Sequence, residues 1–209
     1  MNITIVGTGN MGKALAARFA KAGHRLTIVS RDPAHAASLA AEVGARAASD
    51  SAAVRDAEVV VVATPYEEAV PALRKLGNLA GKVVVDITNP LTADYMGLTI
   101  GHSSSAAEEI AKALSGAEVV KAFNTVFAQV LQEGGDFGRG NTVQVFYAGD
   151  SVRAKQVVEA LIKSIGFAAI DAGPLKNARY LEPVAGLNIY FGYGAGKGTN
   201  IAPAWNART

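Results

Sequence analysis

Apolar residues recur along this chain in two patterns, as short unbroken runs and as positions three or four residues apart. Short β-branched runs predict strands, and the wider spacing predicts amphipathic helices. The predicted strands cover residues 2–6, 24–29, 58–63, 82–87, 118–123, 142–148 and 167–170. Helices are expected over residues 10–22 and 33–43, from the Ser105 capping box toward residue 114, and along a stripe from 157 to 165.

This alternation is typical of an α/β fold of the Rossmann type, with a doubly wound, mainly parallel sheet and helices on both faces. The 209 residues are enough for one substantial core. We therefore expect a single domain over residues 1–209, with a small helical C-terminal extension and arm over about 175–209. Pro183 is expected to kink the helix of this extension or to begin a second one. Residues 192–198, rich in glycine, are expected to form a flexible arm.

Composition excludes several classes of function. The chain has no cysteine, which excludes thiol catalysis and disulfides, and its three histidines lack metal-ligand spacing, so no metal site is expected. A formal net charge of +2 without a basic cluster gives no indication of a nucleic-acid partner. Neither a basic leader nor an unbroken apolar 18-mer precedes the first predicted strand, so the sequence gives no indication of a membrane. We expect a cytoplasmic enzyme with a small-molecule substrate.

The first predicted strand leads directly into a Gly-x-Gly-x-x-Gly turn. Gly7, Gly9 and Gly12 follow strand 2–6 and open helix 10–22, which is the order of a dinucleotide-binding fingerprint. Gly7 makes the tight turn, Gly9 lets the backbone approach a pyrophosphate, and Gly12 lets the helix pack against the sheet. The phosphates would meet the positive end of that helix. A bound NAD(P) or FAD is expected here rather than a merely structural turn.

The end of the second predicted strand indicates which nicotinamide cofactor is bound. NAD enzymes usually present an acidic residue there, which would repel a 2′-phosphate. Ser30 and Arg31 instead offer a hydroxyl and a guanidinium, which favour NADP(H). Asp32 is better explained as a helix N-cap before Pro33. The alternative is that Arg31 is only a solvated surface charge.

Small polar side chains and turn residues gather where later strands end, at residues 64–67, 88–90, 124–127 and 171–174. In an open α/β sheet, ligands bind at the carboxyl ends of the strands. The candidates for an acceptor pocket are Asn89, Asn124, Thr125 and Tyr66, and Tyr66 could either donate a proton or form a wall. Few acid or base groups are present, whereas hydride exchange between two rings depends chiefly on their alignment. No catalytic residue is assigned.

These motifs resemble the NADP oxidoreductases that use the deazaflavin coenzyme F420. The resemblance rests on residues 7–12, 30–31, 65–67, 104–114 and 171–179, and it covers nearly the whole chain. It implies a Rossmann core with a small C-terminal extension, hydride exchange between NADPH and an exchangeable deazaflavin or flavin, and a homodimer. It also implies the cofactor contacts, with Thr8, Asn10 and Met11 at the phosphates, Ser30 and Arg31 at the 2′-phosphate, and Thr64, Pro65 and Asn89 at the nicotinamide ribose.

One stretch departs from this family. The archaeal deazaflavin enzymes have a His-Thr pair after the sixth strand, where this chain has Asn124-Thr125. That stretch is closer to the cytosolic domain of membrane-bound metalloreductases, which pass a hydride from NADPH to a flavin. The acceptor therefore stays open among F420, FMN, FAD and another ring. Two further alternatives are a non-catalytic NADP-binding sensor and a reductase related to pyrroline-carboxylate reductases or β-hydroxyacid dehydrogenases, which need a larger second domain.

Overall fold

One continuous eight-stranded sheet organises the computed structural model, which describes residues 1–49 and 51–208. In sheet order the strands are β3 (Arg46–Ala47), β2 (Arg25–Val29), β1 (Asn2–Val6), β4 (Val59–Val62), β5 (Val83–Asp86), β6 (Glu118–Ala122), β7 (Gln144–Gly149) and β8 (Ala168–Asp171). Only the pair β6–β7 is antiparallel within this part of the chain. The strand order reverses between β1 and β4, which is where a doubly wound sheet has its ligand crevice.

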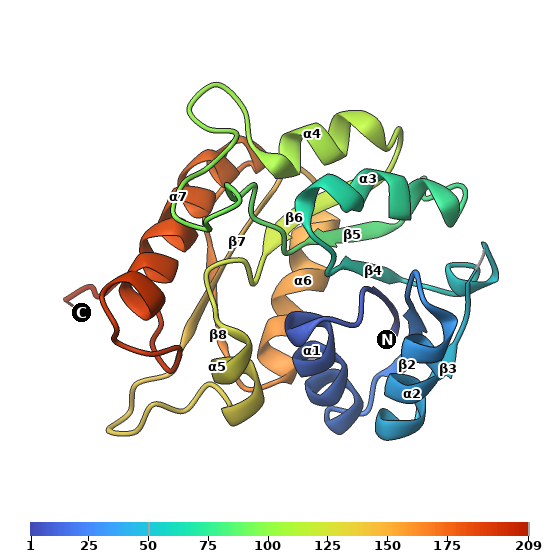
Figure 1. Ribbon diagram of the computed structural model, residues 1–209, viewed down its shortest axis with the longest axis horizontal. Helices are drawn as coiled ribbons and strands as arrows, with labels where there is room; N and C mark the ends of the chain where they lie inside the picture. The colour runs from blue at the N-terminus through green and yellow to red at the C-terminus, as the bar shows by residue number, and fades with distance from the viewer. Residues whose placement is uncertain (50, 209) are drawn as a thin grey trace.

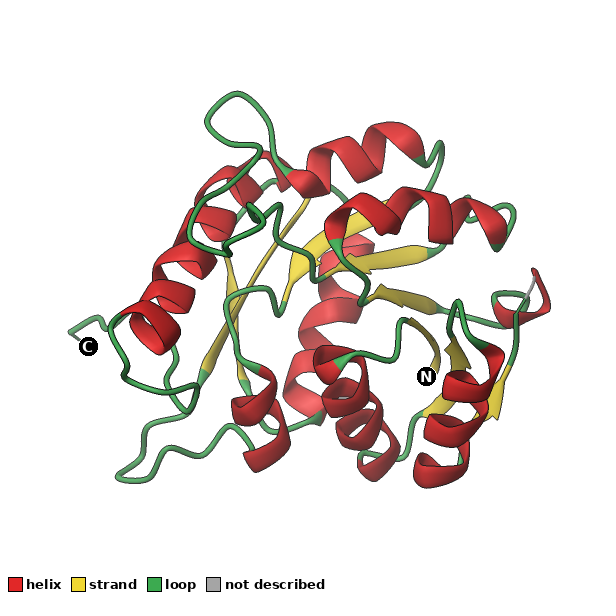
Figure 2. Cartoon of the chain, in the orientation of Figure 1, coloured by secondary structure: helices red, strands yellow, loops and turns green. Residues whose placement is uncertain are grey.

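Helices cover both faces of the sheet (Figure 1 and Figure 2). They are α1 (Asn10–Lys21), α2 (Pro33–Val43), α3 (Tyr66–Lys75), α4 (Ala106–Ala113), α5 (Ala128–Glu133), α6 (Val152–Ser164) and α7 (Ala178–Ile189). Val59 and Val61 of β4 belong to the core cluster under α1, α2, α5 and α6, and Val60 and Val62 belong to the cluster under α3 and α4. Because β4 is covered on both sides, its sequence is apolar throughout. Among the described residues, no helix is long and apolar enough to cross a membrane.

The predicted α/β Rossmann-type fold is confirmed, and most ends of the predicted elements shift by one or two residues. The helix predicted from the stripe 157–165 is α6, which begins earlier, at Val152. The first strand and the start of the helix at Asn10 are where the sequence places them. Two short helices were not predicted, namely α3, which contains Pro71, and α5, which has six residues. α3 lacks a capping side chain at its start and contains a proline, so it carries no clear signal of a helix. The six residues of α5 are too few to produce a strong helical pattern.

The C-terminal extension is helical, as expected, and α7 runs through Pro183 as one helix. A π-helical turn, Tyr190–Gly194, continues it. Residues 192–198, for which a flexible arm was expected, begin within the π-helical turn and fold back through two backbone hydrogen bonds, Lys197 to Phe191 and Gly198 to Gly192. Positive φ angles at Gly196 and Gly198 allow this reversal. The flexibility of this segment stays a prediction. Just beyond it, Thr199 donates to Gln129 of α5 at 2.6 Å.

Candidate functional site

The glycine turn joins β1 to α1 at the crevice, and its three glycines meet different surroundings. Gly7 has a φ of +116°, and a Cβ there would lie 2.4 Å from the Ala63 carbonyl oxygen. A Cβ on Gly12 would lie 2.1 Å from the Gly7 carbonyl oxygen. Gly9 has a φ of −71°, and apart from its adjacent residues no atom of the described chain lies within 4 Å of its added Cβ. The fold therefore requires Gly7 and Gly12, whereas the space over Gly9 is open to a ligand.

The N-terminus of α1 begins at this space without a capping side chain. Its N-cap is Gly9, and its first turn contains no acidic residue. Side chains of Asp32, Ser105 and Ser151, in contrast, accept backbone N–H bonds at the starts of α2, α4 and α6. The first N–H groups of α1 thus find no side-chain cap among the described residues, and the helix dipole places partial positive charge beside them. A pyrophosphate fits such a position.

A cavity of about 430 Å³ lies beside this turn, between the end of β2 and the start of α3. Ser30 and Arg31 line it, together with Gly7, Glu68 and Thr64. The side chain of Arg31 is 81% exposed, and its guanidinium donates a hydrogen bond of 2.8 Å from Nη1 to Glu68 Oε1. A phosphate entering this cavity would therefore meet a solvated guanidinium that already has a carboxylate partner.

The residues that flank Arg31 are held by local hydrogen bonds. Ser30 Oγ lies 3.2 Å from Thr8 Oγ1, which connects the end of β2 to the glycine turn. Asp32 Oδ1 accepts the Ala34 N–H at 2.9 Å, so Asp32 caps α2, as its position before Pro33 predicts. Capping engages Oδ1 of Asp32 and accounts for an acidic residue at this position.

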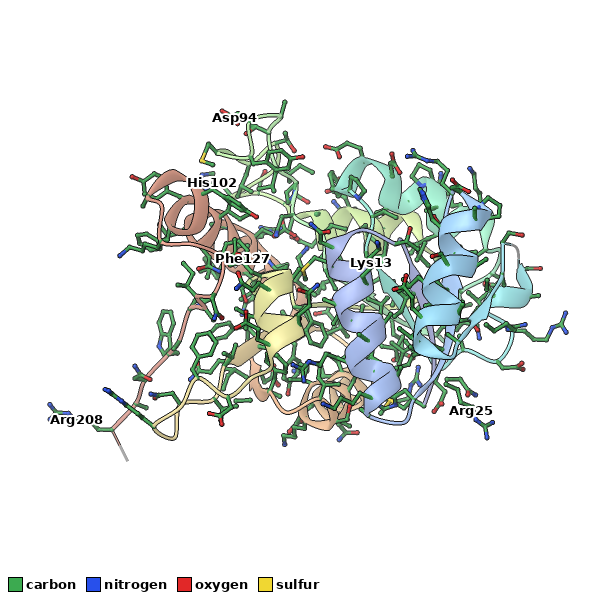
Figure 3. The ribbon with its side chains drawn as sticks, turned by 60° about the horizontal axis from the view of Figure 1, so that its bottom comes forward. Lys13, Arg25, Asp94, His102, Phe127 and Arg208 are labelled. Atoms are coloured by element: carbon green, nitrogen blue, oxygen red, sulfur yellow. The ribbon has the colours of Figure 1, made fainter. Side chains whose placement is uncertain are left out.

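A second cavity, of about 570 Å³, lies at the carboxyl ends of β5 and β6 between α1 and α7. Most of its wall is apolar, with Met11, Ile87, Met96, Val126, Phe127, Ala128, Ala185 and Ile189. Phe127 lies at the start of α5 toward the C-terminal segment (Figure 3), and its ring packs edge to face on Tyr193 with centroids 5.8 Å apart. Among the described residues that line this cavity, only Asp94 is charged. The cavity suits a flat, largely apolar group.

Two asparagines in the wall of the larger cavity fix each other's amides. Asn89 Nδ2 donates to the Asn124 carbonyl at 3.0 Å, and Asn124 Nδ2 donates to both Asn89 Oδ1 and the Leu181 carbonyl at 3.0 Å. Because main-chain carbonyls accept from both amides, the orientation of each amide follows from its partners. Asn124 Oδ1 is left buried without a partner among the described residues, as is Thr125 Oγ1.

The structure brings most of the sequence-predicted site residues together at these two cavities. Asn10, Met11, Asn89, Asn124 and Thr125 line the larger cavity, and Gly7, Ser30, Arg31 and Thr64 line the smaller one. Thr8, Gly9 and Gly12 belong to the turn between them. Pro65, the N-cap of α3, and Tyr66, its first residue, line neither cavity.

Tyr66 is half-buried on the other side of β5 and β6 from α1. Burial raises the pKa of its phenol, and the neighbouring Glu109, Glu182 and Asp86 raise that pKa further. The phenol therefore stays protonated at neutral pH. Its role as an acceptor-pocket residue stays a prediction.

Sequence reasoning missed a buried ionic cluster next to the larger cavity. Lys121 of β6 donates from Nζ to Asp86 Oδ2 at 2.6 Å, to the Thr88 carbonyl at 2.6 Å and to Glu182 Oε1 of α7 at 2.8 Å. The three charged side chains are closed to solvent. A lysine and an aspartate inside otherwise apolar strands were the available signal, because such residues are almost never buried unless paired.

Comparison with known proteins adds to this geometry. Residues 2–90 match the family model for the coenzyme F420-dependent NADP oxidoreductases. The F420-dependent NADP reductase of Methanothermobacter marburgensis is 31% identical over 207 residues, which cover 90% of this chain and 91% of that protein. The metalloreductase STEAP3 of Rattus norvegicus is 33% identical over 183 residues, which cover 87% of this chain and 36% of that protein, so this chain spans about a third of that relative.

The fold of a solved structure agrees with these sequence relationships. A candidate F420-dependent NADP reductase from Arthrobacter sp. FB24 superposes with a TM-score of 0.82 and 32% identity, covering 95% of this chain and 96% of that chain. The matched family, the archaeal reductase and the protein of this solved structure are all described as F420-dependent NADP oxidoreductases or reductases. This chain therefore belongs to the family of coenzyme F420-dependent NADP oxidoreductases.

Proposed function

We propose that this protein transfers a hydride between NADPH and a flavin or deazaflavin ring that binds and leaves as a co-substrate. The larger cavity carries this proposal. It lies at the carboxyl ends of β5 and β6, beside the uncapped start of α1, and its wall is apolar with a few fixed amides. Its volume of about 570 Å³ falls within the range of pockets that hold molecules of this size.

The cofactor would lie across the glycine turn and reach from one cavity to the other. In this proposal the uncapped N–H groups of α1 hold the pyrophosphate, with Thr8, Asn10 and Met11 beside it. Ser30 and Arg31 hold the 2′-phosphate in the smaller cavity, where a guanidinium suits phosphate geometry. Thr64, Pro65 and Asn89 border the nicotinamide ribose. This extended arrangement leaves the α7 side of the larger cavity to the second ring.

The few ionisable groups around the larger cavity favour transfer between two rings. When bound, NADPH supplies a hydride, and the acceptor takes up that hydride together with one proton from water. Asp94, at the tip of the loop after β5 (Figure 3), is a poor proton donor. Hydrogen bonds from the Thr92 hydroxyl and the Met96 N–H lower the pKa of its carboxyl, which stays ionised at neutral pH. The protein's main task is then to hold two rings in line.

The proposal extends to the assembly and its setting. Tyr180, Leu187, Tyr190 and Phe191 of α7 and its π-helical continuation are exposed large apolar residues. Their spacing of three, four and seven residues places them along one side of the helical segment. An exposed apolar stripe of this kind favours association with a second copy, so the proposed assembly is a homodimer. The proposed location is the cytoplasm, and the proposed ligands are small molecules.

Steady-state kinetics tests the proposed function. Initial rates are measured from NADPH absorbance while NADPH and riboflavin, FMN or coenzyme F420 are varied. We expect a colourless purified protein and intersecting double-reciprocal lines, because both ligands must be bound together. A retained flavin with parallel lines would contradict direct transfer. Reduction of imines or carbonyls in place of rings would favour the small-molecule reductase, and NADPH binding without any turnover would favour the sensor.

A further inference from the structure

Thr88, the second residue after β5, is held by side chains at both of its backbone polar groups. Its N–H donates to Asp86 Oδ1 at 2.8 Å, and its carbonyl accepts from Lys121 Nζ at 2.6 Å. Asp86 and Lys121 are register partners on the neighbouring strands β5 and β6, and their own ion pair is 2.6 Å long. Thr88 lies beyond the last residue of β5, so two side chains, rather than a continuing strand, fix the direction in which the chain leaves the sheet.

Asn89, the next residue, lines the larger cavity. The Thr88 carbonyl and the Asn89 N–H belong to one planar peptide, so the ammonium group of Lys121 restrains the start of Asn89 directly. The side chain of Asn89 is restrained as well, because it exchanges two 3.0 Å hydrogen bonds with Asn124. Lys121 itself is closed to solvent and lines neither cavity. A cation outside the cavity thus helps to determine where a polar residue of its wall lies.

We propose that Lys121 is a positioning residue for hydride transfer, which acts through the Thr88 carbonyl and Asn89 on the ribose of the nicotinamide. This inference rests on the proposed function, in which Asn89 borders that ribose. The position of the ribose sets how far the nicotinamide ring lies from the acceptor ring, and transfer between two rings is sensitive to a displacement of about 1 Å. In this arrangement Lys121 contacts neither ligand and transfers no proton. Its loss should therefore lower the rate of hydride transfer more than it weakens NADPH binding.

Stability alone is a poor explanation for a cation at this position. Burial of an ion pair costs so much hydration that apolar side chains of similar volume often replace it without loss of stability. An apolar side chain, however, leaves the Thr88 carbonyl without its donor. The competing assignment is purely structural, since Lys121 also donates to Glu182 of α7 at 2.8 Å. In that assignment Lys121 only anchors α7, and the experiment has to separate the two.

Two variants separate the contact with Thr88 from the contact with α7. Glu182→Gln removes the charge that anchors α7 and keeps the ammonium group on the Thr88 carbonyl. Lys121→Met in the Glu182→Gln background then removes that group as well, without leaving two buried carboxylates unpaired. Thermal unfolding shows whether each variant is folded. If this double variant is unfolded, Asp86→Asn replaces Glu182→Gln as the background of the same comparison.

Single-turnover kinetics supplies the first measurement. Each variant is loaded with NADPH and mixed with a saturating excess of whichever ring is reduced, riboflavin, FMN or coenzyme F420, and the rate of hydride transfer is followed by absorbance. We expect Glu182→Gln to stay within about 2-fold of the wild-type rate. The double variant should lose about 10-fold or more in rate, with the dissociation constant of NADPH changed by about 2-fold or less. Asn89→Ala should lower the wild-type rate but hardly lower that of the double variant, because Lys121 acts through Asn89.

The fluorescence of bound NADPH supplies a second measurement, which needs no acceptor. Its intensity and wavelength depend on the surroundings of the nicotinamide ring. We expect the double variant to change this emission at saturating NADPH, and Glu182→Gln to leave it as in the wild type. A loss of α7 anchoring alone would change the emission in both variants.

The outcomes separate this inference from the proposed function. Equal losses of rate in Glu182→Gln and in the double variant would show that Lys121 only anchors α7, and additive losses with Asn89→Ala would exclude the route through Asn89. A large loss of NADPH affinity with an unchanged rate would also overturn the inference. Reduction of no ring at all would contradict the proposed function itself. The emission of bound NADPH would then decide the inference alone, and unchanged emission in the double variant would overturn it.

Discussion

Lys121 and Glu182 form a 2.8 Å ion pair that connects β6 to α7 beneath the surface of the molecule. Asp86 of β5 binds the same ammonium group at 2.6 Å, so two carboxylates share one cation. Burial raises the pKa of the Glu182 carboxyl, and its two oxygens also accept the Ala106 and Ala107 N–H groups at the start of α4. One side chain of α7 thus contacts two other elements, and this contact holds the α7 wall of the larger cavity in place.

Removing the shared cation should strongly destabilise the protein. Lys121→Met leaves Asp86 and Glu182 buried together without their partner, and we expect the free energy of unfolding to fall by about 3 to 5 kcal/mol. Urea denaturation followed by circular dichroism measures this change. Lys163→Met is the control, because Lys163 pairs with Glu159 at the surface and should contribute less than about 1 kcal/mol. Equal losses in the two variants would contradict this assignment.

Substitution of alanine for Gly9 should impair NADPH binding, whereas the same substitution at Gly12 should impair the stability of the fold. Gly9→Ala meets open space at an ordinary φ, so the fold should keep its stability, while the added methyl occupies the space that the pyrophosphate needs. Gly12→Ala places a Cβ 2.1 Å from a carbonyl oxygen and should destabilise the fold by about 1 to 3 kcal/mol. Thermal unfolding and NADPH titration distinguish the two. Normal NADPH binding by Gly9→Ala would contradict a pyrophosphate site over Gly9 and leave the turn with a structural role alone.

Cofactor choice should depend on Arg31 and on the carboxylate that it contacts. Arg31→Ala removes a charge-assisted hydrogen bond and should weaken NADPH binding by roughly 10- to 150-fold while leaving NADH nearly unchanged. Glu68→Gln keeps the guanidinium and removes its 2.8 Å carboxylate partner, so NADPH should bind up to about 5-fold more tightly. Titration of both cofactors measures these ratios. An equal loss for NADPH and NADH in Arg31→Ala would remove Arg31 from the 2′-phosphate site.

Stability in acid should depend on Glu108. Arg179 donates hydrogen bonds of 2.8 Å and 2.7 Å to its carboxylate, and these, followed by one from Ser105, lower the pKa of Glu108 below its usual 4.5. The stabilisation is present above pH 4.5 and is lost as the pH falls through the lowered native pKa. Wild type should therefore lose stability from about pH 5 to pH 3 more steeply than Glu108→Gln. Denaturation midpoints across this range give both slopes, and parallel curves would contradict the prediction.

The sequence by itself determined the features that depend on neighbouring residues. The turn from Gly7 to Gly12 lies within six positions, and the reason for each glycine can be stated from the turn itself. Gly7 adopts a positive φ, Gly12 avoids a clash with the Gly7 carbonyl oxygen, and Gly9 leaves space open. The cap at Asp32 follows in the same way from a carboxylate that accepts the N–H of Ala34, two residues ahead. Unbroken apolar runs such as β4 predicted strands covered on both faces, because burial alone produces that pattern.

Only the tertiary structure decided which distant residues meet. Arg31 and Glu68 are 37 positions apart, and Asn89 and Asn124 are 35 apart, so their contacts depend on which strands become neighbours in the sheet. Lys121 appeared in the sequence as one polar residue in an apolar strand, and its two carboxylate partners come from β5 and α7. Hydrophobic periodicity specifies which residues are buried, but pairing among buried polar groups depends on strand order and helix docking, which a local pattern does not contain.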